Sequence, residues 1–355
     1  MQQNIHGGDI YSRQIRLDFS VNGNPLGMPD AAVQAIHEAV QHVGEYPDIT
    51  AAALTEAVSR MLSGECGREI PKEYLLFGNG ASELFLAVVH ALKPRNIVIP
   101  VPSFYGYEYV AEAAGSHIKY VYLPEETGFR PGRELLQELT ADTDMLFVAN
   151  PNNPTGQLMG REYLQELLEH CRQQGITVVV DECFIEFCES GREQPKFLLG
   201  EIGQYENLLL VRAFTKSFAM PGVRLGYLVC SNAELREKIR RQLPEWNLSV
   251  FAQRAGIACA EQSEQYLQDT VEYVKNEREY LREGLEKLGR VVSGEVDFLL
   301  LYTTQPIYDS LLAKGVLIRN CENFRGLGKG YYRIAVKKHE ENEVLLQELA
   351  QITAE

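Results

Sequence analysis

The fold and the chemistry are both predicted from residues 212–227, which read Arg-Ala-Phe-Thr-Lys-Ser-Phe-Ala-Met-Pro-Gly-Val-Arg-Leu-Gly-Tyr. Lys216 is the only lysine in this stretch and is the candidate nucleophile. Arg224 lies eight positions later and would hold a phosphate through two parallel hydrogen bonds, while Gly222 and Gly226 let the backbone turn tightly. A lysine amine condenses with an aldehyde, so the stretch predicts a site for a phosphorylated aldehyde cofactor. The competing interpretation is an ordinary surface lysine beside a structural arginine. Motifs elsewhere in the chain are needed to choose between this and a cofactor site.

Short apolar runs alternate with helical stretches from Tyr74 to Cys230. Several of these runs are nearly continuous, which is typical of buried parallel strands. The alternation predicts an α/β domain with a mostly parallel sheet of seven strands. The strands are expected at 74–77, 96–101, 118–123, 144–149, 176–180, 207–211 and 225–230, and helices at 82–92, 105–114, 161–174 and 233–241.

The pattern changes after Pro244, where a long helical stretch carries apolar residues at helical spacing. Short strands near 297–302, 316–319 and 331–336 and a closing helix from Glu340 predict a smaller α+β domain. We expect three parts: an N-terminal arm and part of the small domain at 1–45, a large cofactor-binding domain at 46–243, and the small C-terminal domain at 244–355.

Composition limits the class of partner. The 355 residues carry 34 basic and 49 acidic side chains, a net charge of −15, which disfavours nucleic acid and anionic membranes as partners. An anionic small substrate stays compatible, because the local field of a pocket can oppose the global one. Seven scattered cysteines without a Cys-x-x-Cys pair, and an N-terminus without a basic or apolar leader, predict reduced thiols in the cytoplasm. No metal site is expected.

Two loops at strand ends carry candidate ligands. In the run 77–83, Phe-Gly-Asn-Gly-Ala-Ser-Glu, two glycines lead into a helix whose free N–H groups at Gly80, Ala81 and Ser82 would receive a phosphate. A common strand-to-helix turn is the alternative interpretation. In the run 150–156, Asn-Pro-Asn-Asn-Pro-Thr-Gly, prolines fix a turn at the carboxyl end of a strand, where ligands bind in open α/β sheets.

Two further residues are candidates because of where they stand. Phe104 follows a strand, where an aromatic ring could stack on a ligand or simply pack in the core. Asp181 closes an apolar strand, and a buried acid there should have a partner, although a helix cap is an alternative.

The lysine segment and these loops resemble fold-type I aminotransferases, which use pyridoxal 5′-phosphate. In that family the lysine bonds the cofactor aldehyde and an arginine eight residues later binds its phosphate, which implies these roles for Lys216 and Arg224. The run 150–156 matches the Asn-Pro-x-x-Pro-Thr-Gly signature of histidinol-phosphate aminotransferases and their relatives. The resemblance implies a fold-type I transferase fold and implies that Asn153 bonds the cofactor's 3′ oxygen, Asp181 pairs with its ring nitrogen, Phe104 stacks on its ring, and Gly80, Ala81, Ser82 and Thr215 also bind it.

Phe184 departs from most aminotransferases. Their Asp-x-x-Tyr pattern supplies a hydroxyl to the cofactor, but here the run is Asp181-Glu182-Cys183-Phe184, and that hydrogen bond cannot form. Almost the whole chain resembles the L-threonine O-3-phosphate decarboxylase family of cobalamin biosynthesis, in which phenylalanine is normal at this position. The resemblance is carried by the runs 6–9, 18–22, 24–27, 181–187, 246–249 and 318–321.

The same resemblance implies a substrate site. Arg333 would bind the substrate carboxylate and Arg319 its phosphate, and a planar guanidinium suits both anions. Asn22 and His6 are also expected to bind substrate, although His6 lies at a terminus that could equally be frayed. His6 and Tyr46 would act in the neighbouring subunit of a homodimer, Tyr46 toward the cofactor phosphate. Arg325 is a weaker candidate, because a surface salt bridge explains it equally well.

Three functions remain open from the sequence. The first is decarboxylation of threonine phosphate, or of a similar phospho-amino acid such as O-phosphoserine, to an amine phosphate. The second is transamination of histidinol phosphate or a similar amine. The third is a non-catalytic, cofactor-binding regulator, which the acidic composition disfavours because such regulators carry a basic DNA-binding domain.

Overall fold

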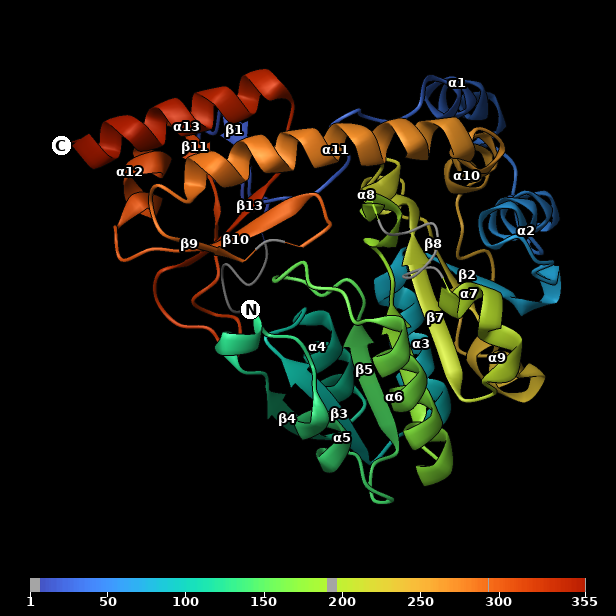
Figure 1. Cartoon of the computed structure of the whole chain (residues 1–355). Coiled ribbons are helices and arrows are strands. Elements are labelled where there is room, and N and C mark those ends of the chain that lie inside the picture. The colour runs from blue at the N-terminus through green and yellow to red at the C-terminus, as the bar shows by residue number, and fades with distance from the viewer. Residues whose placement is uncertain (1–6, 190–196, 293, 355) are drawn as a thin grey trace.

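A seven-stranded sheet forms the larger part of the computed structural model, which describes residues 7–189, 197–292 and 294–354 (Figure 1). The strand order is β2-β8-β7-β6-β5-β3-β4, and every pairing is parallel except those made by β8. The predicted mostly parallel sheet of seven strands is therefore confirmed. Its strands are β2 (Leu75–Gly78), β3 (Asn96–Val101), β4 (His117–Tyr122), β5 (Met145–Ala149), β6 (Thr177–Asp181), β7 (Leu208–Ala213) and β8 (Gly226–Val229).

The central strands are apolar throughout because both of their faces are covered. In β6, Val178 and Val180 join the apolar cluster on one face, whereas Val179 joins the cluster on the other. This alternation follows from the two-residue period of a strand. One face is covered by α2 (Ala52–Cys66), α6 (Arg161–Gln174), α7 (Phe197–Glu201) and α10 (Val250–Glu261), and the other by α3 (Ala81–Leu92), α4 (Gly106–Ala113) and α9 (Ala233–Arg240).

A second sheet of four antiparallel strands, in the order β12-β13-β10-β9, forms the smaller part. The N-terminal β1 (Leu17–Asp18) pairs in parallel with β11 (Val316–Leu317), so the start of the chain joins this C-terminal part. The long α11 runs from the smaller part to α10 (Figure 1). The other elements here are β9 (Arg290–Val292), β10 (Phe298–Tyr302), β12 (Arg319–Asn320), β13 (Tyr331–Ala335), α11 (Ser263–Leu285), α12 (Ile307–Ala313) and α13 (His339–Ala354).

The prediction did not resolve α10 as a separate helix, and the reason lies in its composition. Its buried face is made of small residues, Ala252, Ala255, Gly256 and Cys259, which give no periodic signal of large apolar side chains. A Cβ at Gly256 would lie 2.5 Å from the Leu225 side chain, so close packing requires glycine there. The prediction also lacked β9, α7 and α5 (Arg133–Glu138), whereas the helix expected at 30–42 is present as α1 (Asp30–Ala39) and the 3₁₀ turn that follows it. Within the described ranges, no helix combines the length and apolarity that crossing a membrane would need.

Candidate active site

Lys216 lies in a one-turn helix between two antiparallel strands. This helix, α8 (Phe214–Ser217), follows β7 directly, and a turn then leads into β8. The Phe214 N–H donates to the Leu225 carbonyl at 3.1 Å and closes the base of the connection. Lys216 and Arg224 therefore lie on the same connection between β7 and β8. This connection stands at the edge of the sheet where β6 and β7 also end.

The amine of Lys216 is largely shielded from water. Its Nζ donates to the carbonyl oxygen of Asn22 at 3.0 Å. Burial lowers the pKa of Lys216 to about 8, the charge of Arg333 adds to this effect, and the charge of Asp297 opposes it. A depressed pKa makes the neutral, nucleophilic amine accessible at moderate pH.

Arg224 and the start of α3 form a cradle that only glycine permits. Gly80 has a φ of +79°, and a Cβ on it would lie 2.3 Å from Arg224 Nη2. A Cβ on Gly226 would lie 2.7 Å from the Ala81 nitrogen. Arg224 itself has a φ of +62°, and its guanidinium donates only to backbone carbonyls, with no carboxylate within ion-pair distance in the described parts of the chain. N–H groups at a helix start and an uncompensated guanidinium together suit a bound phosphate.

Asp181 at the end of β6 has two donors of its own. The Tyr107 hydroxyl donates to Oδ2 at 2.6 Å, and the Cys183 backbone N–H donates to Oδ1 at 2.9 Å. Burial raises the pKa of Asp181, and the hydrogen bonds from Cys183 and Tyr107 oppose that rise. The expected partner of this buried acid within the chain is therefore a tyrosine.

Two phenylalanines form part of the apolar wall. Phe104 meets the Tyr107 ring edge to face, with 5.6 Å between ring centroids. Phe184 packs edge to face on Phe298 at 5.2 Å. Both line the same cavity as Lys216 and Asp181, and Phe184 brings no hydroxyl to it.

Arg333 and Arg319 stand opposite each other on neighbouring strands β13 and β12. Arg333 donates to the Asn153 side-chain oxygen at 2.6 Å and to the Ser20 carbonyl at 2.9 Å, while its buried Nε has no hydrogen-bond partner in the described structure. The Arg319 guanidinium lies 5.1 Å from the centre of the Phe324 ring. Burial lowers the pKa of Arg333 to about 10, so it stays a cation near neutral pH. Two neighbouring cations on one wall suit a doubly anionic ligand.

A cavity of about 260 Å³ joins nearly all of the predicted site residues. Gly80 lies just behind it against Arg224. Tyr46 does not line it: this side chain is 81% exposed and packs on Trp246, with 4.8 Å between ring centroids. His6 lies outside the described residues. The cavity is lined by the predicted residues Asn22, Ala81, Ser82, Phe104, Asn153, Asp181, Thr215, Lys216, Arg224, Arg319 and Arg333.

Arg325 forms a surface ion pair, which agrees with its interpretation as a surface salt bridge and not as a ligand of the substrate. Its guanidinium donates to the Glu108 carboxylate at 2.9 and 3.2 Å and lies 4.0 Å from the centre of the Tyr120 ring. It does not line the cavity. The contact ties the loop after β12 to α4.

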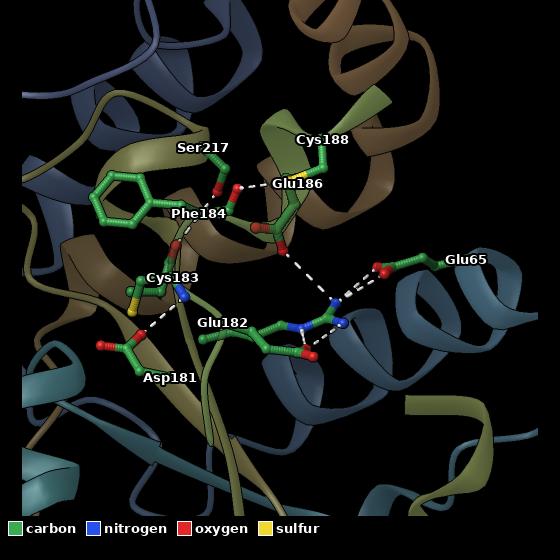
Figure 2. A network of polar contacts seen from close by, with 10 residues as sticks. Glu65, Asp181, Glu182, Cys183, Phe184, Glu186, Cys188 and Ser217 are labelled. Atoms are coloured by element: carbon green, nitrogen blue, oxygen red, sulfur yellow. Dashed lines mark hydrogen bonds and ion pairs between the residues drawn. The ribbon is translucent and has the colours of Figure 1, made fainter. Parts of the chain in front are cut away.

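A buried charge cluster supports the strand ends behind the cavity. Arg212 is 0% exposed and contacts Glu182 at 2.8 Å, Glu65 at 2.9 Å and Glu186 at 3.7 Å. Figure 2 shows Glu65 reaching this point from α2, and Glu182 and Glu186 from the segment after β6, with Glu182 directed away from Asp181. Burial, with repulsion from Glu65 and Glu186, raises the pKa of Glu182 to about 7 although Arg212 opposes the rise. The cluster joins β6 to β7 and so fixes the spacing of Asp181 and the Lys216 helix.

Sequence reasoning missed Tyr107, Cys183, Ser20 and Phe324, which also line the cavity. Tyr107 stands three residues after Phe104, and that spacing at a helix start places both rings on one face. This spacing was the one available signal. Ser20 contacts Arg333 through its backbone carbonyl, and Cys183 contacts Asp181 through its backbone N–H as well as its thiol. Side-chain identity does not reveal the backbone contacts.

The arrangement fits pyridoxal 5′-phosphate. The glycine cradle leaves room beside Arg224 for an anion, Lys216 supplies an amine of lowered pKa, and Asp181 is a buried acid on the cavity wall. Asn153 presents an amide whose oxygen is already bound by Arg333. Each chemical group of the cofactor thus has a counterpart of matching character in this cavity.

Comparison with known proteins agrees with this fit. The family model described as aminotransferase class I and II, a pyridoxal-phosphate-dependent family, matches residues 14–349. A provisionally named threonine-phosphate decarboxylase of Caldanaerobacter subterraneus subsp. tengcongensis is 37% identical over 97% of this chain and 92% of its own length. The threonine-phosphate decarboxylase of Salmonella typhimurium is 33% identical over 98% of this chain and 96% of its own. The solved histidinol-phosphate aminotransferase of Clostridium acetobutylicum superposes with a TM-score of 0.85 at 33% identity, covering 95% of this chain and 98% of that one. The chain therefore belongs to the class I and II aminotransferase family.

Proposed function

We propose that this chain decarboxylates L-threonine O-3-phosphate to (R)-1-aminopropan-2-yl phosphate and CO2, with pyridoxal 5′-phosphate as cofactor. The observation that carries the proposal is the position of Arg319 and Arg333, two neighbouring cations on the cavity that also holds Lys216. A phospho-amino acid has two anionic ends, and each arginine would bind one. The relatives named threonine-phosphate decarboxylase point to the same substrate.

The cofactor would be held at four places. Lys216 would bond its aldehyde, and Asp181 would accept a hydrogen bond from its protonated ring nitrogen. Its phosphate would lie on the N–H groups at the start of α3 and on Arg224. Asn153 would donate through its amide nitrogen to the 3′ oxygen, since Arg333 occupies its amide oxygen.

When bound, this cofactor supplies an electron-accepting ring that stabilises the carbanion left at the substrate α-carbon. The residues of the chain decide which bond breaks. Arg333 would bind the carboxylate and Arg319 the phosphate, and fixing both ends orients the Cα–carboxylate bond for cleavage. The departing carboxylate leaves its electron pair at the α-carbon, and a proton must replace it there.

Lys216 is the group that would deliver this proton. Its amine lies on the cavity wall with a pKa of about 8, close to the value at which one group both accepts and donates protons near neutral pH. The apolar wall of Phe104 and Phe184 would keep water away from the reacting carbon. The reaction consumes one proton per CO2 released and needs no oxidant or second substrate.

A second candidate is transamination of histidinol phosphate. It is favoured by the 33% identity to the Clostridium acetobutylicum aminotransferase over nearly the whole chain. The same cavity would serve, with Lys216 moving a proton from the α-carbon instead. Phe184 argues against it, because the tyrosine usual in aminotransferases is absent.

We also propose a homodimer in which Tyr46 reaches the neighbouring cofactor phosphate. Tyr46 and Trp246 form an exposed aromatic pair, and Val40, Val43 and Ile49, which are close to Tyr46 in sequence, are each more than half exposed. Apolar surface of this kind marks an association site. Light scattering on the purified protein should give about twice the 40.0 kDa chain mass, and a mass of one chain would refute the dimer.

One assay separates the functions. Purified protein reconstituted with pyridoxal 5′-phosphate is incubated with L-threonine O-3-phosphate, with and without 2-oxoglutarate, and the products are identified by mass spectrometry. We expect CO2 and the amine phosphate at equal rates in both. Glutamate formed from histidinol phosphate and 2-oxoglutarate in a parallel incubation, without CO2 release from L-threonine O-3-phosphate, would establish an aminotransferase instead. No product and no bound cofactor would refute both.

A further inference from the structure

Tyr107 holds a position in the cavity wall that no sequence motif assigns to it. Its side chain is 0% exposed, and its hydroxyl donates to Oδ2 of Asp181 at 2.6 Å. The other oxygen of Asp181 accepts the Cys183 N–H at 2.9 Å. Each oxygen of the acid therefore has a hydroxyl or backbone donor, the Cys183 thiol adds a further hydrogen bond to the acid, and lone pairs remain for a ligand on the cavity side.

The Tyr107 ring is held from three directions. It stacks on Phe147, with 5.3 Å between centroids and 10° between planes. Phe85 and Phe104 meet it edge to face at 5.4 and 5.6 Å. A ring so enclosed cannot change its direction without repacking the core, so the hydroxyl has a fixed position. Phe104, on the same wall, takes part in this packing through its contact with Tyr107.

The hydrogen bond also acts on the charge of Asp181. Burial favours the neutral form of this acid, and donors to its oxygens favour the ionised form. Burial beside Asp181 raises the pKa of Tyr107 well above its ordinary value, so the hydroxyl keeps its proton and acts as a donor. When Asp181 is ionised, the pair consists of a neutral phenol and a carboxylate, which is a charge-assisted hydrogen bond.

We propose that Tyr107 is a positioning residue that keeps Asp181 ionised and oriented for the ring nitrogen of the cofactor. The inference rests on the proposed function, since it assumes a pyridine nitrogen opposite Asp181. It adds a residue that touches neither substrate nor cofactor through its hydroxyl and acts through the acid. Without the hydroxyl, Asp181 would lose one donor and hold the protonated ring nitrogen less strongly.

The test is Tyr107→Phe, which removes one oxygen and keeps the packed ring. Its matched control is Tyr163→Phe, because the Tyr163 hydroxyl also donates one hydrogen bond, to the Gly132 carbonyl at 2.9 Å, but lies outside the cavity. Two quantities are measured: the dissociation constant of pyridoxal 5′-phosphate, and the ¹⁵N chemical shift of cofactor labelled at the pyridine nitrogen and bound at neutral pH. Unfolding temperatures of the cofactor-free proteins report on packing.

We expect Tyr107→Phe to weaken cofactor binding by about tenfold to a hundredfold, the effect of one hydrogen bond to a charged group. Its ¹⁵N shift should move toward that of the neutral pyridine, while Tyr163→Phe keeps the wild-type shift and affinity. Unchanged affinity and shift in Tyr107→Phe, or a change confined to the unfolding temperature, would overturn the inference. If the wild-type protein itself fails to bind the cofactor, the proposed function falls, and this inference falls with it.

Discussion

The Lys216 amine donates a hydrogen bond to the backbone carbonyl of Asn22, with 3.0 Å between nitrogen and oxygen. Asn22 lies shortly after β1, which pairs with the smaller part of the molecule, whereas Lys216 follows β7 of the large sheet. The amine is thus held between two segments 194 residues apart in sequence and is shielded by both.

This shielding predicts the pH at which Lys216 reacts. Only the neutral amine attacks an aldehyde, and because burial lowers the pKa from 10.5 to about 8, its fraction should rise through pH 8. Cofactor-free protein is mixed with pyridoxal 5′-phosphate and trapped with borohydride, and the labelled peptide is quantified across pH. Half-maximal labelling at Lys216 is expected near pH 8. A midpoint above about pH 10 would contradict the buried environment, and Lys216→Ala, which must lose the labelled peptide, is the control.

The glycine cradle predicts that one added methyl group weakens cofactor binding at Gly80 but not at Gly222. Gly80→Ala would force an alanine into φ +79° and press its Cβ against Arg224, so cofactor affinity should fall about tenfold or more. Gly222→Ala is the matched control. Gly222 lies on the same β7–β8 connection as Arg224, and a Cβ added there would have no atom within 4 Å. Equilibrium titration with pyridoxal 5′-phosphate checks both variants. Equal losses in the two would mean that contact with Arg224 is not the cause.

The contacts of Arg333 predict that replacing it, even by lysine, weakens substrate binding. Its guanidinium reaches both the Asn153 side chain and the Ser20 carbonyl, and an ammonium group cannot make both contacts and also bind a carboxylate through two nitrogens. Arg333→Lys should therefore lower kcat/KM about tenfold or more while the cofactor stays bound. Arg325→Lys, at the surface pair with Glu108, should stay within about threefold. Steady-state kinetics decide, and a similar loss in both variants would count against Arg333 as the carboxylate ligand.

The strands of the large sheet, and the meeting of candidate residues at their ends, could be predicted because both follow from short-range rules. Asp181 ends β6 and Lys216 follows β7, and the carboxyl ends of these neighbouring parallel strands meet at one edge of the sheet. Tyr107 was not predicted, because an aromatic residue in an apolar helix reads as core and its hydroxyl bond spans 74 residues. Likewise Arg212 opens the decisive stretch, but its partner Glu65 stands 147 residues away, and no local pattern pairs them.

The Arg212 cluster predicts a large loss of stability when its cation is removed. Arg212→Leu would leave the buried Glu182 and the partly buried Glu65 without their cation, and breaking a buried pair by removing one partner costs about 3–5 kcal/mol. Urea denaturation of the cofactor-free protein measures this loss. Because Glu182 would then face only other acids, the loss should be smaller at pH 5, where its raised pKa lets it take up a proton, than at pH 8. Arg240→Ala removes an exposed arginine that pairs with Glu237 and should change stability little at either pH. An Arg212 variant as stable as the Arg240 variant, or one equally unstable at both pH values, would show that the buried acids are not what this arginine compensates.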